Sequence, residues 1–212
     1  MTAELVVGLL DSGVEAALSA HLRASRAFVD ETRPGPYGHG TAIARIILHH
    51  APGAAVVHAQ VFGARQRTTP ALAAAGLDWL RAEGARIVNM SVGLRHDRAV
   101  LRHAIAGAQA AGMILVASAP ARGAMVYPGG YAGVIRVSGD ARCGPDEISA
   151  LGGGPADYGA CPHDTEGRPG GASFAAAHVT GLLASHLSKT SHESRALLDR
   201  LARFHGRERR LA

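Results

Sequence analysis

The chain has 212 residues, which is enough for one domain with a sizeable buried core. Its net charge of +5 either favours an acidic partner or reflects an arginine-rich composition. Nucleic acid is not expected as a partner, because no basic run is interleaved with aromatic residues. No stretch approaches 18 consecutive apolar residues and no export signal precedes the first apolar segment, so we expect no membrane span and a cytoplasmic location.

Strands and helices are expected to alternate along the first half of the chain. The predicted elements are a strand at 4–10, a short helix at 14–23, a strand at 24–29, a Pro/Gly loop at 32–38, a buried helix at 40–50 and a strand at 54–62. The run Thr68-Thr69-Pro70 predicts the start of the next helix, because a hydroxyl cap and a first-turn proline favour helix initiation. That helix should end near Glu83, before Gly84.

The second half continues the same alternation. The predicted elements are strands at 86–90, 113–117 and 134–138, helices at 97–111, 173–187 and 191–204, and a mostly irregular segment at 143–165 with a short strand at 147–151. The apolar positions of the helix at 97–111 are Val100, Leu101, Ala104, Ile105 and Ala108. This order predicts an α/β fold with a mostly parallel central sheet and helices on both faces. Without repeats or a composition break, residues 1–212 are expected to form a single domain.

Candidate functional residues gather at one edge of the predicted sheet. Asp11 ends the first strand, and the segments 91–93 and 117–122 follow the ends of two others. In parallel sheets, binding sites form at the carboxyl ends of the strands. We therefore expect these segments to meet at one site.

Residues 170–181 place Ser173 in the first turn of an alanine-rich helix. There the free N–H groups and the helix dipole favour a developing negative charge. An unassisted serine is a poor nucleophile, but His39, flanked by two glycines, and Asp11 could supply a base and an orienting acid. The alternatives are a helix-capping serine, an ordinary loop histidine and an aspartate that forms a turn with Gly13.

Three blocks resemble the subtilases, the subtilisin-like serine proteases, in the chain order of that family. Residues 6–13 are similar to its aspartate block, 38–42 to its histidine block and 170–181 to its serine block. Two weaker blocks, 87–93 and 127–139, are similar to the cleft edge and to the strand after the oxyanion loop.

The resemblance implies a three-layer subtilisin-like fold and a serine endopeptidase that acts on a peptide or protein substrate. Ser173 would attack the scissile carbonyl, His39 would transfer the proton, and Asp11 would hold the imidazole. The implied substrate-binding residues, which pair with an extended peptide or form the pocket walls, are Ser91, Val92, Gly93, Ala117, Ser118 and Ala119.

The chain departs from the family at the oxyanion loop, where Pro120 stands in place of the asparagine that donates to the oxyanion. Proline has no donor, and loss of one such donor costs about 100- to 1000-fold in turnover in subtilisin. Ser118 or Arg122 could supply the donor from a reshaped loop, or the N–H of Ser173 could act nearly alone in a slow enzyme. The remaining alternative is a catalytically silent escort that binds peptides in the same cleft.

No cofactor is expected, and no spaced cluster of histidine, cysteine and acidic residues predicts a metal site. His49 and His50 are interpreted as capping a helix end, and His178 as structural by resemblance. Cys143 and Cys161 are expected to be free thiols, because no export signal is present.

The chain begins close to its aspartate strand, so we expect no pro-segment. Its small size and altered oxyanion loop resemble the small subtilases that remove leader peptides from ribosomally made, enzymatically modified peptides, such as the type that acts in quinohemoprotein amine dehydrogenase assembly. This narrower resemblance implies one modified client peptide as the substrate.

Overall fold

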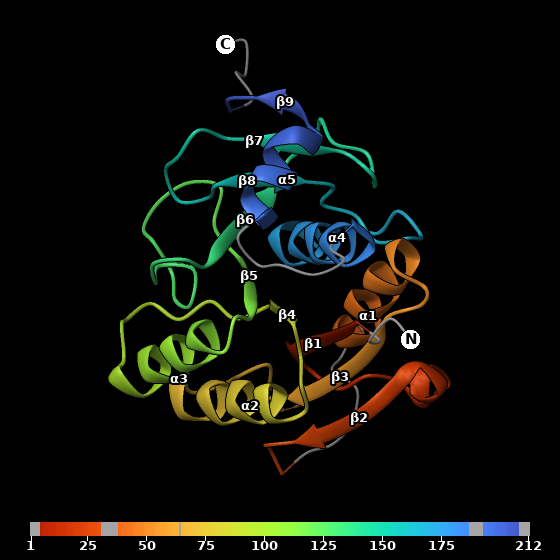
Figure 1. Ribbon diagram of the computed structural model, residues 1–212, viewed down its shortest axis with the longest axis vertical. Helices are drawn as coiled ribbons and strands as arrows, with labels where there is room; N and C mark the ends of the chain where they lie inside the picture. Colours follow the sequence, from red (N-terminus) through yellow and green to blue (C-terminus); the bar gives the residue numbers. More distant parts are fainter. Residues whose placement is uncertain (1–4, 31–37, 64, 187–192, 208–212) are drawn as a thin grey trace.

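The structure, a computed structural model, describes residues 5–30, 38–63, 65–186 and 193–207. These residues form one sheet flanked by helices (Figure 1). In chain order the elements are β1 (Val6–Asp11), the 3-10 helix η1 (Ala16–His21), β2 (Leu22–Ala27), α1 (His39–His50), β3 (Ala55–Gln60), α2 (Pro70–Ala82), β4 (Ile87–Met90), α3 (Ala99–Ala110), β5 (Ile114–Ser118), β6 (Ile135–Gly139), β7 (Ile148–Ala150), β8 (Tyr158–Ala160), α4 (Gly171–His186), α5 (Ser194–Leu201) and β9 (Ala202–His205). Within these ranges, no helix combines the length and apolarity needed to cross a membrane.

The sheet has nine strands in the order β2-β3-β1-β4-β5-β6-β8-β7-β9. All neighbouring pairs from β2 to β8 are parallel, β7 is antiparallel to β8, and β9 runs parallel to β7. β2 and β9 form the two edges, which lie at opposite ends of the molecule in Figure 1. The predicted mostly parallel α/β sheet is therefore confirmed.

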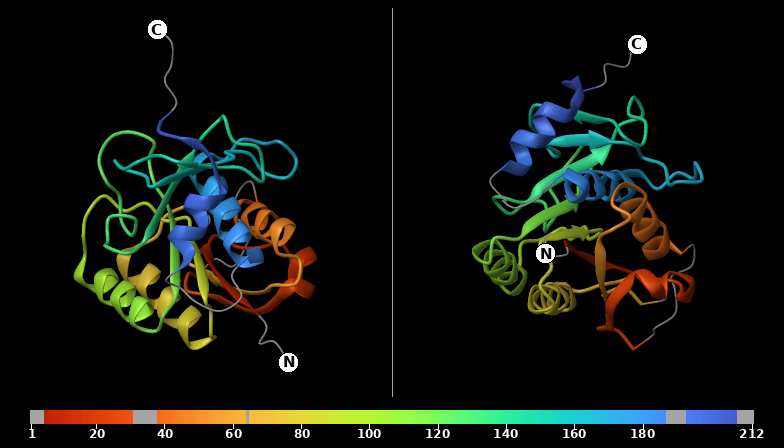
Figure 2. Two further views of the ribbon diagram at one scale, coloured as in Figure 1. Left: turned by 45° about the horizontal axis from the view of Figure 1, so that its top comes forward. Right: turned by 45° about the vertical axis from the view of Figure 1, so that its right-hand side comes forward.

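Each face of the sheet has its own core, because successive side chains of a strand point to opposite faces. Val7 and Leu9 of β1 pack in the cluster that contains α1 and α4, whereas Val6 and Leu10 pack in the cluster that contains α2 and α3. Figures 1 and 2 show these helix pairs on opposite sides of the sheet. The three-layer arrangement predicted from the sequence is confirmed.

α1 and α4 approach each other closely on their face of the sheet. A Cβ atom on Gly181 would lie 2.9 Å from the Cβ of His50 and 3.1 Å from the carbonyl oxygen of Ile47. Only glycine fits this contact without displacing one helix. The close packing of α1 against α4 brings together the two helices that carry His39 and Ser173.

Most predicted elements are present with ends shifted by one or two residues. The start of α2 is as predicted, since Thr69 is the N-cap and its Oγ1 accepts from the N–H of Leu72 at 3.2 Å. Some ends of the predicted elements lie outside the described residues. These are Glu4 of the first strand, 32–37 of the Pro/Gly loop, Leu187 of the helix at 173–187, and 191–192 of the last helix.

Four expectations need correction. The helix expected at 14–23 is instead the short 3-10 helix η1, followed directly by β2. The irregular segment at 143–165 contains β8, which the sequence analysis missed and which lies between β6 and β7. The last helix ends at Leu201, because the following residues pair with β7 as β9. On α3, Val100 is 48% exposed, while the other four predicted apolar positions are buried.

Candidate active site

Asp11 is the last residue of β1 and is buried at the carboxyl end of the sheet. Its Oδ1 accepts hydrogen bonds from the backbone N–H of Ser12 at 2.6 Å and from the Ser12 hydroxyl at 3.1 Å. Burial raises the pKa of Asp11, but the facing His39, the nearby Ser91 hydroxyl and the Ser12 N–H together hold that pKa below its usual value. Asp11 is therefore a buried carboxylate.

His39 is the first residue of α1, and its Nδ1 lies 2.8 Å from Oδ1 of Asp11. A carboxylate can only accept, so Nδ1 carries the proton and Nε2 of the neutral ring is left as the acceptor. Burial lowers the pKa of His39, but the Asp11 carboxylate outweighs burial and raises the pKa above its ordinary value. This arrangement fixes one tautomer and strengthens the ring as a base.

Ser12 joins β1 to α1, a role that sequence reasoning missed. Its hydroxyl donates to Asp11 and accepts from the N–H of Gly40 at 3.1 Å. Its carbonyl accepts from Nε2 of His58 at 2.9 Å, and Nδ1 of the same ring lies 2.9 Å from the Ser25 hydroxyl. The only sequence signals were a serine directly after Asp11 and a histidine within a largely apolar strand.

Gly40 is needed because α1 begins very close to β1. A Cβ atom at this position would lie 2.3 Å from the Ser12 carbonyl oxygen and 2.9 Å from the Gly13 carbonyl oxygen. On the other side of His39, Gly38 has φ +56°, in the left-handed region that favours glycine. Gly40 thus permits the close approach of α1 to β1, and Gly38 permits the left-handed turn that precedes His39.

Ser173 is the third residue of α4 and is half-buried. The turn before it is fixed by the Pro162 carbonyl, which accepts from the N–H groups of Gly170 at 2.9 Å and Gly171 at 3.0 Å. The next residue, Phe174, has its ring centroid 5.7 Å from that of His39. The imidazole therefore lies beside the first turn of α4.

The structure gives no hydrogen bond between the described residues Ser173 and His39. Contacts between a catalytic nucleophile and its base are often long without substrate and tighten in the complex. The structure thus brings together Asp11, His39 and the helix turn that carries Ser173.

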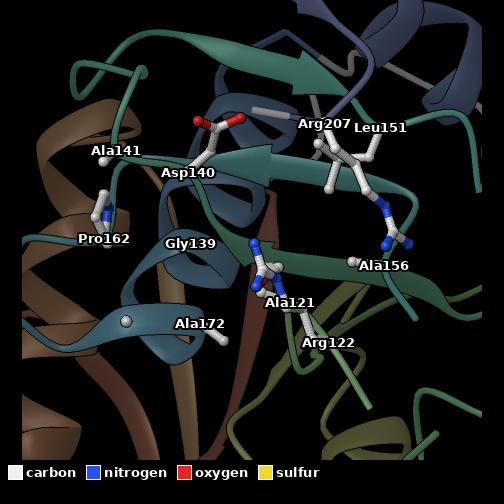
Figure 3. Close-up of a pocket in the computed structure, with 12 residues that line it drawn as sticks. Ala121, Arg122, Gly139, Asp140, Ala141, Leu151, Ala156, Pro162, Ala172 and Arg207 are labelled. Carbon is white, nitrogen blue, oxygen red and sulfur yellow. The ribbon is translucent and has the colours of Figure 1, made fainter. Parts of the chain in front are cut away.

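A cavity of about 640 Å³ adjoins the start of α4. Its lining includes Arg122 of the predicted oxyanion loop, Gly171 and Ala172 of α4, and Arg207. Figure 3 shows the side chains of Arg122 and Arg207 extending toward this space from different walls. Arg207 also donates to the Gly153 carbonyl at 3.0 Å. The cavity therefore presents two cationic groups close to the start of the helix that carries Ser173.

The other predicted substrate-binding residues differ in exposure. Val92, Ala117 and Ala119 are buried, and Ser118 is 8% exposed as the last residue of β5. Ala117 packs in the core that contains α2 and α3, which leaves its backbone, not its side chain, for any contact with substrate. Gly93 is exposed, and Ser91 follows directly after β4.

A cluster of histidines lies at the opposite end of α1 from His39. The predicted capping role of His49 and His50 is replaced by a backbone cap, in which the N–H of Ala51 donates to the Ile47 carbonyl. Nε2 of His50 lies instead 2.8 Å from Nδ1 of the buried His178. Burial lowers the pKa of His50 to about 4 and also lowers that of His178.

The expectation of no metal cluster missed one grouping. Ligand atoms of His49, His50 and Asp146 all lie within 4.8 Å of one another. The spacing in sequence could not indicate this, since Asp146 is brought in by the fold. Cys143 and Cys161 are both buried free thiols, as predicted, and burial raises the pKa of Cys143 to about 11.

The family model described as "Subtilase family" matches residues 2–206. The chain therefore belongs to the subtilase family of subtilisin-like serine peptidases. It is 31% identical over 145 residues to subtilisin BL of Lederbergia lenta, a match that covers 62% of this chain and 54% of that protein. It is 27% identical to subtilisin DY of Bacillus licheniformis, over 88% of this chain and 78% of that protein. The chain thus spans about half the length of the first of these relatives.

Solved structures show the same fold at low sequence identity. A lanthipeptide protease superposes with a TM-score of 0.71 at 16% identity, covering 92% of this chain and 80% of the other. The protease domain of PatA gives 0.68 at 22% identity, with 91% and 81% covered. The prenylagaramide maturation protease PagA gives 0.63 at 19% identity, with 85% and 74% covered.

Proposed function

We propose that this subtilase is a serine endopeptidase in which Ser173 is the nucleophile, His39 the general base and Asp11 the residue that orients the base. The 2.8 Å contact between Nδ1 of His39 and Oδ1 of Asp11, made beside the first turn of α4, is the observation that carries the proposal. The free N–H groups of that turn add a second element of support, because they favour a developing negative charge.

The proposed reaction has two steps. Ser173 Oγ bonds to the scissile carbonyl carbon as its proton passes to Nε2 of His39, and the C–N bond then breaks as that proton passes to the leaving amine. Water then attacks the carbonyl carbon of the resulting ester as one of its protons passes to Nε2 of His39, and the C–O bond breaks as that proton passes to Ser173 Oγ, which releases the acid and restores the hydroxyl. Asp11 remains a carboxylate throughout and stabilises the imidazolium.

For the oxyanion, Arg122 is the better supported of the two candidate donors. Arg122 lines the cavity together with Gly171 and Ala172, whereas Ser118 is buried at the end of β5 and does not line that cavity. A guanidinium has five N–H donors and carries a full charge, so it can replace the amide that Pro120 cannot provide.

We propose further that the substrate is a dedicated client peptide from which the enzyme removes a leader. A lanthipeptide protease and a prenylagaramide maturation protease share the fold, which supports this reading by analogy alone. Arg122 and Arg207 line the cavity, and its one acidic lining residue, Asp140, is paired with Arg142. The two arginines therefore favour a client peptide with acidic residues close to the cleaved bond. Residues 1–212 would act as a single peptidase domain, and the two free thiols fit a reducing cytoplasm.

A fluorophosphonate probe tests the nucleophile directly. The probe should modify Ser173 in the wild type, as located by peptide mass, and should not modify Ser173→Ala. His39→Ala and Asp11→Asn should each label far more slowly than the wild type. The variant that carries both substitutions should label little more slowly than either single variant, because the three residues act as a unit. Ser185→Ala is the matched control, since Ser185 is an exposed serine of the same helix and should label as the wild type does.

Labelling that persists in Ser173→Ala would contradict the assignment, and a wild type that does not label would favour the peptide-binding escort. The client is tested separately by incubating equal amounts of enzyme with casein and with a candidate client that carries its leader. A single cut in the client and slow action on casein are expected. Rapid digestion of casein at many sites would refute the dedicated client and leave the protease assignment intact.

A further inference from the structure

A chain of hydrogen bonds connects three histidines at the end of α1. Nε2 of His178 lies 2.8 Å from the carbonyl oxygen of His163, and Nδ1 of His178 lies 2.8 Å from Nε2 of His50. A carbonyl can only accept, so Nε2 of His178 must carry a proton. When both rings are neutral, Nδ1 of His178 accepts from Nε2–H of His50. Nδ1 of His50 then has a lone pair and no proton.

That lone pair faces another acceptor. Nδ1 of His50 lies 3.4 Å from Oδ1 of Asp146. Two acceptors held face to face repel each other unless a proton or a metal ion lies between them. A proton would make an imidazolium of a side chain that is only 3% exposed, and burial disfavours this charged form. Asp146 is 78% exposed, so an ion can reach the position from solvent.

We propose that His49, His50 and Asp146 bind one divalent transition-metal ion, with zinc as the type case. Zinc binds imidazole nitrogen and carboxylate oxygen at about 2.0–2.2 Å, which places tetrahedral ligands about 3.4 Å apart. The His50–Asp146 distance matches this value, and all three ligand atoms lie within 4.8 Å of one another. His49 and Asp146 are exposed, so rotation of their side chains can bring the ligands to bonding distance.

The donor set selects the class of ion. Two imidazoles and one carboxylate suit zinc and its transition-metal neighbours, whereas calcium and magnesium take oxygen ligands. The hydrogen bond from Nε2 of His50 to His178 orients the ligand and fixes its tautomer, as such bonds do in established metal sites. An adjacent cavity of about 580 Å³, lined by His49, His163 and His178, provides room for water to complete the coordination.

The ion would have a structural role, separate from the proposed chemistry. It would join the end of α1 to the segment between β6 and β7, which contains Asp146. His39 lies at the other end of this 12-residue helix, roughly 16 Å away along the axis. A cation at the carboxyl end of α1 also interacts favourably with the helix dipole.

Zinc binding to the full chain tests the site. The protein is treated with EDTA, freed of chelator and titrated with zinc chloride by isothermal calorimetry at neutral pH. We expect one ion per chain, and binding weakened roughly 10- to 100-fold in His49→Gln and in Asp146→Asn. His103→Gln is the matched control, because His103 is an exposed histidine of α3 and should leave zinc binding unchanged. Added calcium chloride should not reduce zinc binding at this site.

Thermal unfolding gives an independent readout. At free zinc 100-fold above its dissociation constant, the Tm of the wild type should rise by about 5–10 °C, and that of Asp146→Asn should rise far less. Zinc binding weaker than about 100 μM, equal loss of binding in His103→Gln, or unchanged binding in both ligand variants would overturn the proposal. In those cases a proton, rather than a metal ion, occupies the gap between His50 and Asp146.

Discussion

The substitution Gly40→Ala tests whether the separation of α1 from β1 sets the geometry of His39, the proposed general base. By helix propensity alone this change would stabilise the protein by up to about 1 kcal/mol, since alanine favours helix more than glycine does. The structure predicts the opposite sign. The new Cβ atom would lie 2.3 Å from the Ser12 carbonyl oxygen, a distance that real contacts do not tolerate.

The required displacement follows from the contact distances. An ordinary contact between carbon and oxygen is about 3.3 Å, so α1 and Ser12 must separate by about 1 Å. Ser12 cannot move freely, because its carbonyl is held by His58 and its hydroxyl by Asp11. The movement therefore falls on the start of α1, where His39 lies. Misplacement of a reacting group by about 1 Å can cost on the order of 100-fold in rate.

The assay is the second-order rate of labelling of Ser173 by a fluorophosphonate, measured together with the Tm. Gly40→Ala should label on the order of 100-fold more slowly than the wild type. Gly53→Ala is the control, because a Cβ atom on Gly53 would meet nothing within 4 Å. A Gly40→Ala variant that labels at the wild-type rate with an unchanged or raised Tm would refute the reasoning.

Two further predictions concern the base and the oxyanion. Asp11 raises the pKa of His39, and only the neutral ring can accept a proton, so the labelling rate should fall as the pH decreases through a value above about 6.5. Asp11→Asn should move this acidic fall in rate to lower pH. A fall that stays at the same pH in Asp11→Asn would show that Asp11 does not raise the pKa of the base. Arg122→Ala should lower kcat on a cleaved client peptide about 10-fold or more with little change in KM. Arg207 lines the same cavity, and Arg207→Ala should lower kcat less. Equal effects of the two substitutions on kcat would exclude Arg122 as the oxyanion donor.

Local signals made some of the fold predictable from the sequence. The start of α2 depends on Thr69 and Pro70, whose capping and backbone preferences act within one turn. The buried strands of the sheet could be recognised because both faces are covered, which requires continuous apolar runs. The contact of Asp11 with His39 was implied by the resemblance of residues 6–13 and 38–42 to the subtilase blocks, because His39 does not follow a strand.

Features that depend on long-range pairing were not predictable. β8 has three residues and exists because β6 and β7 pair with it on either side. β9 replaces the end of a predicted helix because pairing with β7 outweighs local helix preference. Likewise, Ser12 showed no sign of its contact with Gly40, 28 positions away, and the histidines of α1 showed no sign of Asp146.

Helix α1 links these observations, because both of its ends are held by contacts that a larger residue would break. Gly40 lets its first turn lie against Ser12, and Gly181 of α4 lets its last turn lie against α4. A rigid helix held at both ends cannot shift along its axis to relieve a change at one end, since packed interiors transmit strain. The structure therefore predicts that the two ends are coupled. With zinc bound, loss of Asp146 at one end should lower the stability first, and it should affect His39 only to the extent that α1 moves as a body.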